Sequence, residues 1–154
     1  MGLGRYDAQD QLEKIEELHD VTLVEAGQLD VADLGVRLEE LKALRQGWFD
    51  GETGDALNQS GLSQVSSIIE HLHEQEELPI PFLYPTPDGA LQAEWSLGSW
   101  ELSAAIDLTS GDTLLDAVDA NTNAGKDGSM NLFTPGGQEA LVKFVNSVTR
   151  KGSI

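Results

Sequence analysis

The segment from Leu91 to Ile106 constrains the fold more than any other part of the sequence, because apolar and polar residues alternate on both sides of a two-residue turn. Gly98-Ser99 has glycine first, which is typical of a type II′ β-hairpin turn. In the register that this turn sets, the apolar positions share one face: Leu91, Ala93, Trp95, Leu97, Trp100, Leu102, Ala104 and Ile106. A slip of one residue would mix the two faces, so the sequence predicts a hairpin in this register.

We expect the other face of this hairpin to be polar. Its outward positions are Gln92, Glu94, Ser96, Glu101, Ser103 and Asp107. Before it, four prolines between Pro79 and Pro87 exclude a helix and a central strand, so Phe82–Tyr84 is predicted to be a short edge strand. A further strand is predicted over residues 113–120, followed by a polar loop as far as Gly128.

Helical spacing of apolar residues predicts four helices, over residues 8–19, 31–45, 60–77 and 135–149. The second is expected to end before Gly47. Thr134-Pro135 has the pattern of an N-cap followed by proline at the first helical position. Helices, then strands, then a helix predict an α+β fold, in which N-terminal helices pack on one face of a small antiparallel β-meander and a C-terminal helix closes it. At 154 residues the chain is expected to form one acidic domain, 1–154.

The charge of the chain is strongly one-sided. Its formal net charge is −18, and the 80 residues between Arg45 and Lys126 contain 14 Asp and Glu but no Lys or Arg. Such a surface repels nucleic acid and anionic membranes and attracts basic partners. The chain has no cysteine, which excludes disulfides and thiolate chemistry. Because no apolar run resembles a signal peptide or a membrane span, we expect a soluble, cytoplasmic protein.

Three segments resemble a family of small, uncharacterised bacterial proteins. They are Gly47-Trp48-Phe49-Asp50-Gly51-Glu52, the run from Leu78 to Gly89, and Gln92-Ala93-Glu94-Trp95. The family has a W-D-G-x-G-like turn and a Y-P-T-x-D-G-G-x-Q-x-E-W hairpin. Here Phe49 interrupts the Trp-Asp pairing, and Ala90 stands where the pattern has a second glycine. The resemblance covers residues 38–108 and implies a fold without an established activity.

Signatures of catalysis and cofactor binding are absent from the sequence. There is no P-loop, no G-x-S-x-G elbow and no Rossmann fingerprint, so we expect neither catalytic residues nor a cofactor. Glu70, His73 and Glu77 share a helix face, but a di-iron site needs a second Glu-x-x-His unit. Residues 119–127 resemble the start of a calcium loop, yet Ala124 and Met130 occupy the places of its glycine and its glutamate. We expect no metal site, and calcium binding by this loop remains the open alternative.

These observations favour a non-enzymatic acidic protein-interaction module. Concrete versions are an inhibitor, an antitoxin or immunity-type protein, or a DNA mimic that occupies a basic surface of a toxin or of a nucleic-acid-binding protein. The predicted binding residues are Glu70, Glu74, Glu76, Glu77 and Trp48. Carboxylates at a helix C-terminus are locally unfavourable, which suggests a binding role for these glutamates. The alternatives are an accessory subunit that docks through its hairpin edge, and a metal-dependent module.

Overall fold

The computed structural model describes residues 29–153, and it describes side chains as far as residue 149. The elements follow in the order α2 (Val31–Lys42), α3 (Gln59–Glu76), β1 (Phe82–Pro85), β2 (Leu91–Leu97), β3 (Trp100–Ile106), β4 (Asp112–Asp119), β5 (Gly125–Asn131) and α4 (Pro135–Ser153). The helix predicted over residues 8–19 lies outside the described residues. None of the helices in the described part is long and apolar enough to cross a membrane.

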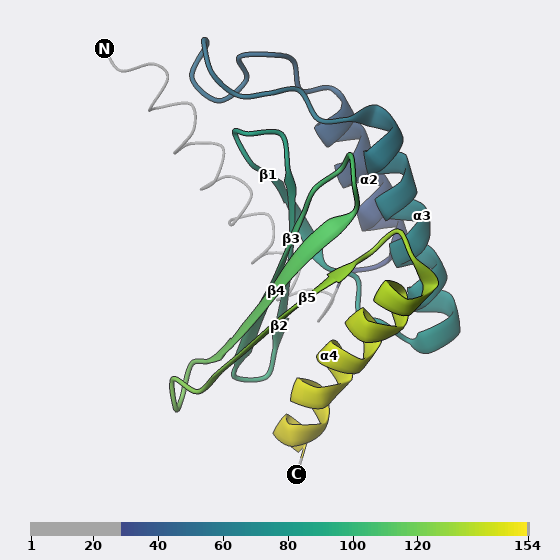
Figure 1. Ribbon diagram of the computed structural model, residues 1–154, viewed down its shortest axis with the longest axis vertical. Helices are drawn as coiled ribbons and strands as arrows, with labels where there is room; N and C mark the ends of the chain where they lie inside the picture. Colours follow the sequence, from purple (N-terminus) through teal and green to yellow (C-terminus); the bar gives the residue numbers. More distant parts are fainter. Residues whose placement is uncertain (1–28, 154) are drawn as a thin grey trace.

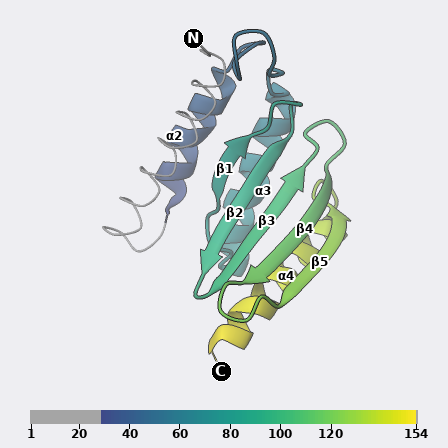
Figure 2. The same ribbon diagram turned by 90° about the vertical axis from the view of Figure 1, so that its left-hand side faces the viewer.

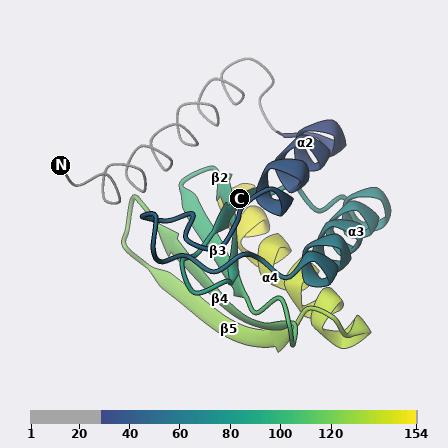
Figure 3. The ribbon, with the colours of Figure 1, turned by 90° about the horizontal axis from the view of Figure 1, so that it is seen from above.

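The described residues form two layers, a sheet and a set of helices. The five strands are all antiparallel and follow the order β1-β2-β3-β4-β5, so the sheet is a simple meander. Helices α3 and α4 lie on one side of this sheet, and α2 packs beside α3 near β1 (Figures 1 and 3). Figure 2 views the opposite side, on which no helix of the described range 29–153 covers strands β3, β4 and β5. The predicted α+β fold is confirmed.

The predicted hairpin is present in the predicted register. Leu91 pairs with Ile106 and Leu97 with Trp100. Gly98 has a φ of 63°, and Ser99 is not among the residues with positive φ, as a type II′ turn requires. Seven of the eight inward side chains are buried and Leu97 is half-buried, so the hairpin supplies much of the core.

Capping residues set the ends of α2 and α3. Asp30 and Asp33 form a capping box, in which each carboxylate accepts the backbone N–H of the other at 2.9 Å. Asn58 caps α3 by accepting the N–H of Gly61 at 2.8 Å. Helix α2 ends at Lys42, three residues before the predicted end, and Gly47, with a φ of 89°, belongs to the following turn. Thr134 accepts the N–H of Gly137 at 3.0 Å, so the predicted N-cap of α4 is confirmed.

Strand β5 corrects the prediction of a polar loop extending to Gly128. It pairs with β4 over its whole length, from Gly125 opposite Val118 to Asn131 opposite Asp112. Its inward positions are Lys126, Gly128 and Met130, which alternation of apolar residues cannot identify. Lys126 is accommodated because its ammonium group donates to the Ser147 hydroxyl and lies 5.8 Å from the Phe144 ring centre, both on α4.

The outward face of the sheet is also less polar than expected. Strand β4 turns Thr113, Leu115 and Ala117 into the core, which leaves Leu114 and Val118 outward. Leu114 is 68% exposed and Val118 is 40% exposed. The expectation of a polar outward face, which follows from alternation in the 91–106 hairpin, does not extend to β4, because Leu114 and Val118 lie outward there.

Candidate protein-interaction surfaces

The fourteen carboxylates between Arg45 and Lys126 all reach solvent. Ten of these residues are exposed, and Asp50, Glu70, Glu94 and Asp119 are half-buried. Within the described part of the chain one ion pair forms, between Arg37 Nη1 and Glu40 Oε1 at 2.9 Å, and it lies outside this stretch. The negative charges are therefore not neutralised by neighbouring cations, and the surface carries a strong negative potential.

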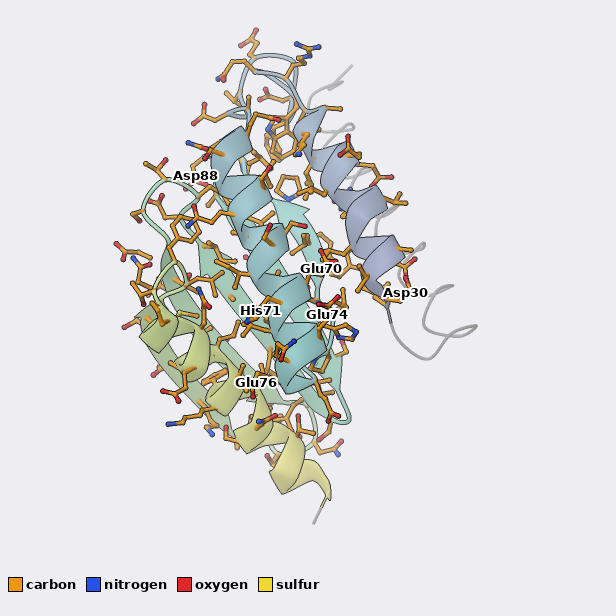
Figure 4. The ribbon with its side chains drawn as sticks, turned by 90° about the vertical axis from the view of Figure 1, so that its right-hand side faces the viewer. Asp30, Glu70, His71, Glu74, Glu76 and Asp88 are labelled. Atoms are coloured by element: carbon orange, nitrogen blue, oxygen red, sulfur yellow. The ribbon has the colours of Figure 1, made fainter. Side chains whose placement is uncertain are left out.

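One group of acids lies at the C-terminal end of α3, as the sequence predicts. Glu74, Glu76 and Glu77 are exposed, whereas Glu70, one turn earlier, is half-buried. Glu77 is the C-cap and adopts a left-handed conformation with a φ of 60°. Figure 4 shows Glu70, Glu74 and Glu76 along this half of the helix, with Asp30 at the start of the neighbouring α2. We call Glu70, Glu74, Glu76 and Glu77 the α3 acid group.

Trp48 does not belong to the α3 acid group. It lies in the turn between α2 and α3, near the N-terminal end of α3, whereas the acids lie at the other end of this 18-residue helix. Trp48 is half-buried, its indole N–H donates to the Asp55 carbonyl at 2.8 Å, and its ring contacts Phe49 edge to face at 5.8 Å. These contacts fix a turn, so Trp48 and the acids do not form one site.

Hydrogen bonds join the segments that carry the family resemblance to one another at two places. The backbone N–H of Asp55 donates to the Pro87 carbonyl at 2.8 Å, which ties the Trp48 turn to the β1–β2 turn. Thr86 closes the β1–β2 turn, because its hydroxyl donates to Asp88 and accepts the Ala90 N–H. Trp95 donates its indole N–H to the Pro79 carbonyl at 2.7 Å. These hydrogen bonds give the motif residues an architectural role.

Four aspartates have a lowered pKa because hydrogen bonds stabilise the charged carboxylate. Backbone N–H groups lower the pKa of Asp30, Asp50 and Asp119, and the Thr86 hydroxyl lowers that of Asp88. Each of these aspartates caps a helix or closes a turn. The pKa shifts therefore report local structure, and they do not indicate a catalytic acid or base.

A second acidic surface lies on the outward face of the sheet, and the sequence predicted only the part of it that lies on the 91–106 hairpin. The pairing places Glu94, Ser103, Asp116 and Asp127 in one row across β2 to β5. Asp116 and Asp127 are directly opposite each other and both are exposed. Like charges at opposed positions are unfavourable. No outward position of the five strands holds Lys or Arg. Alternation over residues 113–119 could have identified Asp116, whereas Asp127 required β5.

An apolar groove of about 190 Å³ separates α2 from β1. Arg37 lies in it, where its Nε donates to the Leu83 carbonyl at 2.8 Å and its guanidinium lies 5.9 Å from the Phe82 ring centre. The second terminal nitrogen of Arg37 is buried without a hydrogen-bond partner. The guanidinium thus joins α2 to β1, which accounts for a half-buried cation in an acidic chain.

Two places in the sequence resemble parts of a metal site, the helix face of Glu70, His73 and Glu77 and the loop over residues 119–127. The described residues contain no group of three or more His, Asp or Glu arranged to hold an ion. His73 Nδ1 lies 2.7 Å from the Leu78 carbonyl. In the β4–β5 turn, the Asp119 carboxylate accepts from the Asn121 N–H at 3.0 Å and the Thr122 hydroxyl at 3.1 Å. Asp127 lies on β5, so it extends away from this turn.

We predict that calcium, zinc and a chelator each leave the thermal melting temperature unchanged, because the carboxylate oxygens of Asp119 already accept hydrogen bonds from donors within the turn. Differential scanning calorimetry with each additive checks this. A rise in melting temperature with calcium that Asp119→Ala abolishes would contradict the prediction, because a ligand bound only by the folded state must stabilise it.

The sequence and the structure have no match among family models, curated proteins or solved structures. Function must therefore be inferred from the surfaces themselves.

Proposed function

We propose that this protein is a non-enzymatic acidic module that binds a basic surface of a protein partner in the cytoplasm. Its partner would be a toxin or a nucleic-acid-binding protein, and the module would act as an inhibitor, an antitoxin or immunity-type protein, or a DNA mimic. The observation that carries the proposal is that all fourteen carboxylates between Arg45 and Lys126 reach solvent and that none of them forms an ion pair with a cation of residues 29–149.

The physical basis of the proposal is that the unpaired carboxylates lower the stability of the folded state, and no local ion pair offsets this loss. Unpaired carboxylates repel one another and destabilise the folded state, while they accelerate the encounter with a cationic partner. Three members of the α3 acid group, Glu74, Glu76 and Glu77, place carboxylates at a helix end that is already negative. Opposed Asp116 and Asp127 add a like-charge contact on the sheet. A basic partner would relieve both kinds of repulsion.

The alternative is an accessory subunit that docks through apolar contacts, and the exposure of Leu114 and Val118 favours it. Salt separates the two functions. Binding through carboxylates weakens steeply when ionic strength rises from about 0.05 M to about 0.3 M, because the screening length falls. Binding through an apolar surface changes little over the same range.

The test is affinity capture from the native host, followed by purification of the captured partner and measurement of its Kd at both salt concentrations. We expect Glu70→Lys, Glu74→Lys and Glu77→Lys together to reduce affinity at least about tenfold while leaving the fold intact. The melting temperature of this triple variant should equal or exceed that of the wild type, because cations are favoured at a helix C-terminus.

A matched control changes charge elsewhere on the same surface. Glu39→Lys, Glu52→Lys and Glu139→Lys alter the net charge equally, at exposed positions outside the α3 acid group. If both triple variants weaken binding equally, the α3 acid group has no specific role. If neither variant nor salt changes the affinity, the proposed electrostatic function is wrong.

A further inference from the structure

We propose that the outward face of β3, β4 and β5 is a docking site for a basic amphipathic helix of the partner. This inference rests on the proposed function and adds the location and the secondary structure of what is bound. We call this surface the open sheet face. Its helix-binding character follows from the two exposed aliphatic side chains on β4, the small residues beside them and the carboxylates around them.

The aliphatic side chains form a line along β4. Leu114 and Val118 are four residues apart in a strand, so they are separated by about 13 Å. A helix rises about 12 Å over eight residues. A helix that lies along β4 can therefore place apolar side chains from successive turns against both residues. Helices already cover the other face of the same sheet, and packing on this face would complete a third layer.

The neighbours of Leu114 are small, which leaves space for side chains from above. In its row across the sheet, Ala105 lies on one side of Leu114 and Ser129 on the other. An open depression of about 640 Å³ lies here, with Ala90 at one end and Asp107 and Asp112 among its lining residues. Leu114 is thus an exposed apolar side chain beside a depression that is bordered by carboxylates. This shape can accept an apolar side chain that is flanked by Lys or Arg.

Charge complementarity indicates that the apolar stripe of the partner helix is flanked by cationic residues. Asp116 lies between Leu114 and Val118 on the same face, and Asp127 lies opposite it. Glu101 is paired with Val118 on the β3 side. No lysine or arginine occupies an outward position of the sheet. An apolar line bordered on both sides by carboxylates matches a helix whose apolar stripe is bordered on both sides by Lys or Arg.

The probe is a synthetic peptide of Leu, Lys and Ala, about five helical turns long, with one apolar stripe flanked by lysines. A peptide of the same composition in scrambled order is its control. Fluorescence anisotropy with the full chain should give at least about tenfold tighter binding of the amphipathic peptide. Amide chemical shift changes should be confined to β3, β4 and β5. Equal affinity for the two peptides would overturn the proposal.

Two pairs of variants test the location. Asp116→Asn with Asp127→Asn, and separately Leu114→Ser with Val118→Ser, should each weaken peptide binding at least about tenfold. The aspartate pair should not lower the melting temperature, because it removes a like-charge contact. Glu39→Gln with Glu139→Gln removes the same charge as the aspartate pair, at exposed positions outside both acidic surfaces, and should leave peptide affinity unchanged. If this control pair weakens binding as much as the sheet pairs do, the open sheet face is the wrong location although the proposed function stands. If neither carboxylate pair nor salt matters, both are wrong.

Discussion

Trp95→Ala should lower the free energy of unfolding by about 3–5 kcal/mol, the usual cost of truncating a buried aromatic side chain. Trp95 is 4% exposed and lies at the centre of β2, paired with Leu102. The substitution removes the ring from the core and leaves the Pro79 carbonyl without the indole N–H that it accepts at 2.7 Å. Domains of this size have a total stability of about 5–15 kcal/mol, so the variant should be close to unfolding.

The matched control is Glu94→Gln, one residue earlier on the same strand but on the outward face. It should change stability by less than about 0.5 kcal/mol, because it alters a solvent-accessible group and preserves its shape. Urea denaturation midpoints of both variants check the pair of expectations. Equal loss of stability in the two variants would contradict the assignment of Trp95 to the inward face and Glu94 to the outward face of the hairpin.

Gly61→Ala should destabilise the protein by at least about 2–3 kcal/mol, because there is no room for a β-carbon. An ideal Cβ on Gly61 would lie 2.1 Å from the Leu108 carbonyl oxygen and 2.8 Å from the Leu108 Cβ. Leu108 is buried in the β3–β4 turn, so the N-terminal turn of α3 rests directly on the end of the sheet. Relieving the clash requires movement of the helix or of the turn, which would disturb the packing of both layers.

Gly136→Ala is the control for this effect. Gly136 is also in the first turn of a helix, and its added Cβ would meet nothing within 4 Å. Alanine reduces the conformational freedom of the unfolded chain, so this variant should be neutral or stabilised by up to about 1 kcal/mol. Thermal unfolding of both variants makes the comparison. A stable Gly61→Ala variant would contradict the close approach of α3 to the Leu108 carbonyl.

The parts of the fold that the sequence predicted are those whose residues satisfy one pattern throughout. The 91–106 hairpin was predictable because every second residue is apolar and only one register keeps them together. Strand β5 was not, because its inward Lys126 is stabilised by Ser147 and Phe144, which lie about twenty residues later in the sequence. A contact between elements distant in sequence leaves no periodic signal near either residue.

The same distinction applies to the candidate surfaces. The α3 acid group could be placed on a helix end from local sequence, and the structure puts it there. The open sheet face could not be predicted, because Asp127 meets Asp116 only through pairing of β4 with β5. The sequence also offered Trp48 as a binding residue. In the structure it is half-buried, and the hydrogen bond to the Asp55 carbonyl and the Phe49 contact make it part of a turn.

The residues that made β5 unpredictable from the sequence also affect how the protein behaves at high concentration. The edge strands of an open meander can recruit other strands and lead to fibrils. Here β5 is one edge and carries two glycines, a lysine and an aspartate, all poor material for a growing sheet. The other edge, β1, ends in Pro85, which has no N–H to donate. Both edge strands therefore oppose polymerisation of the sheet, which leaves the faces of the sheet for contact with other molecules.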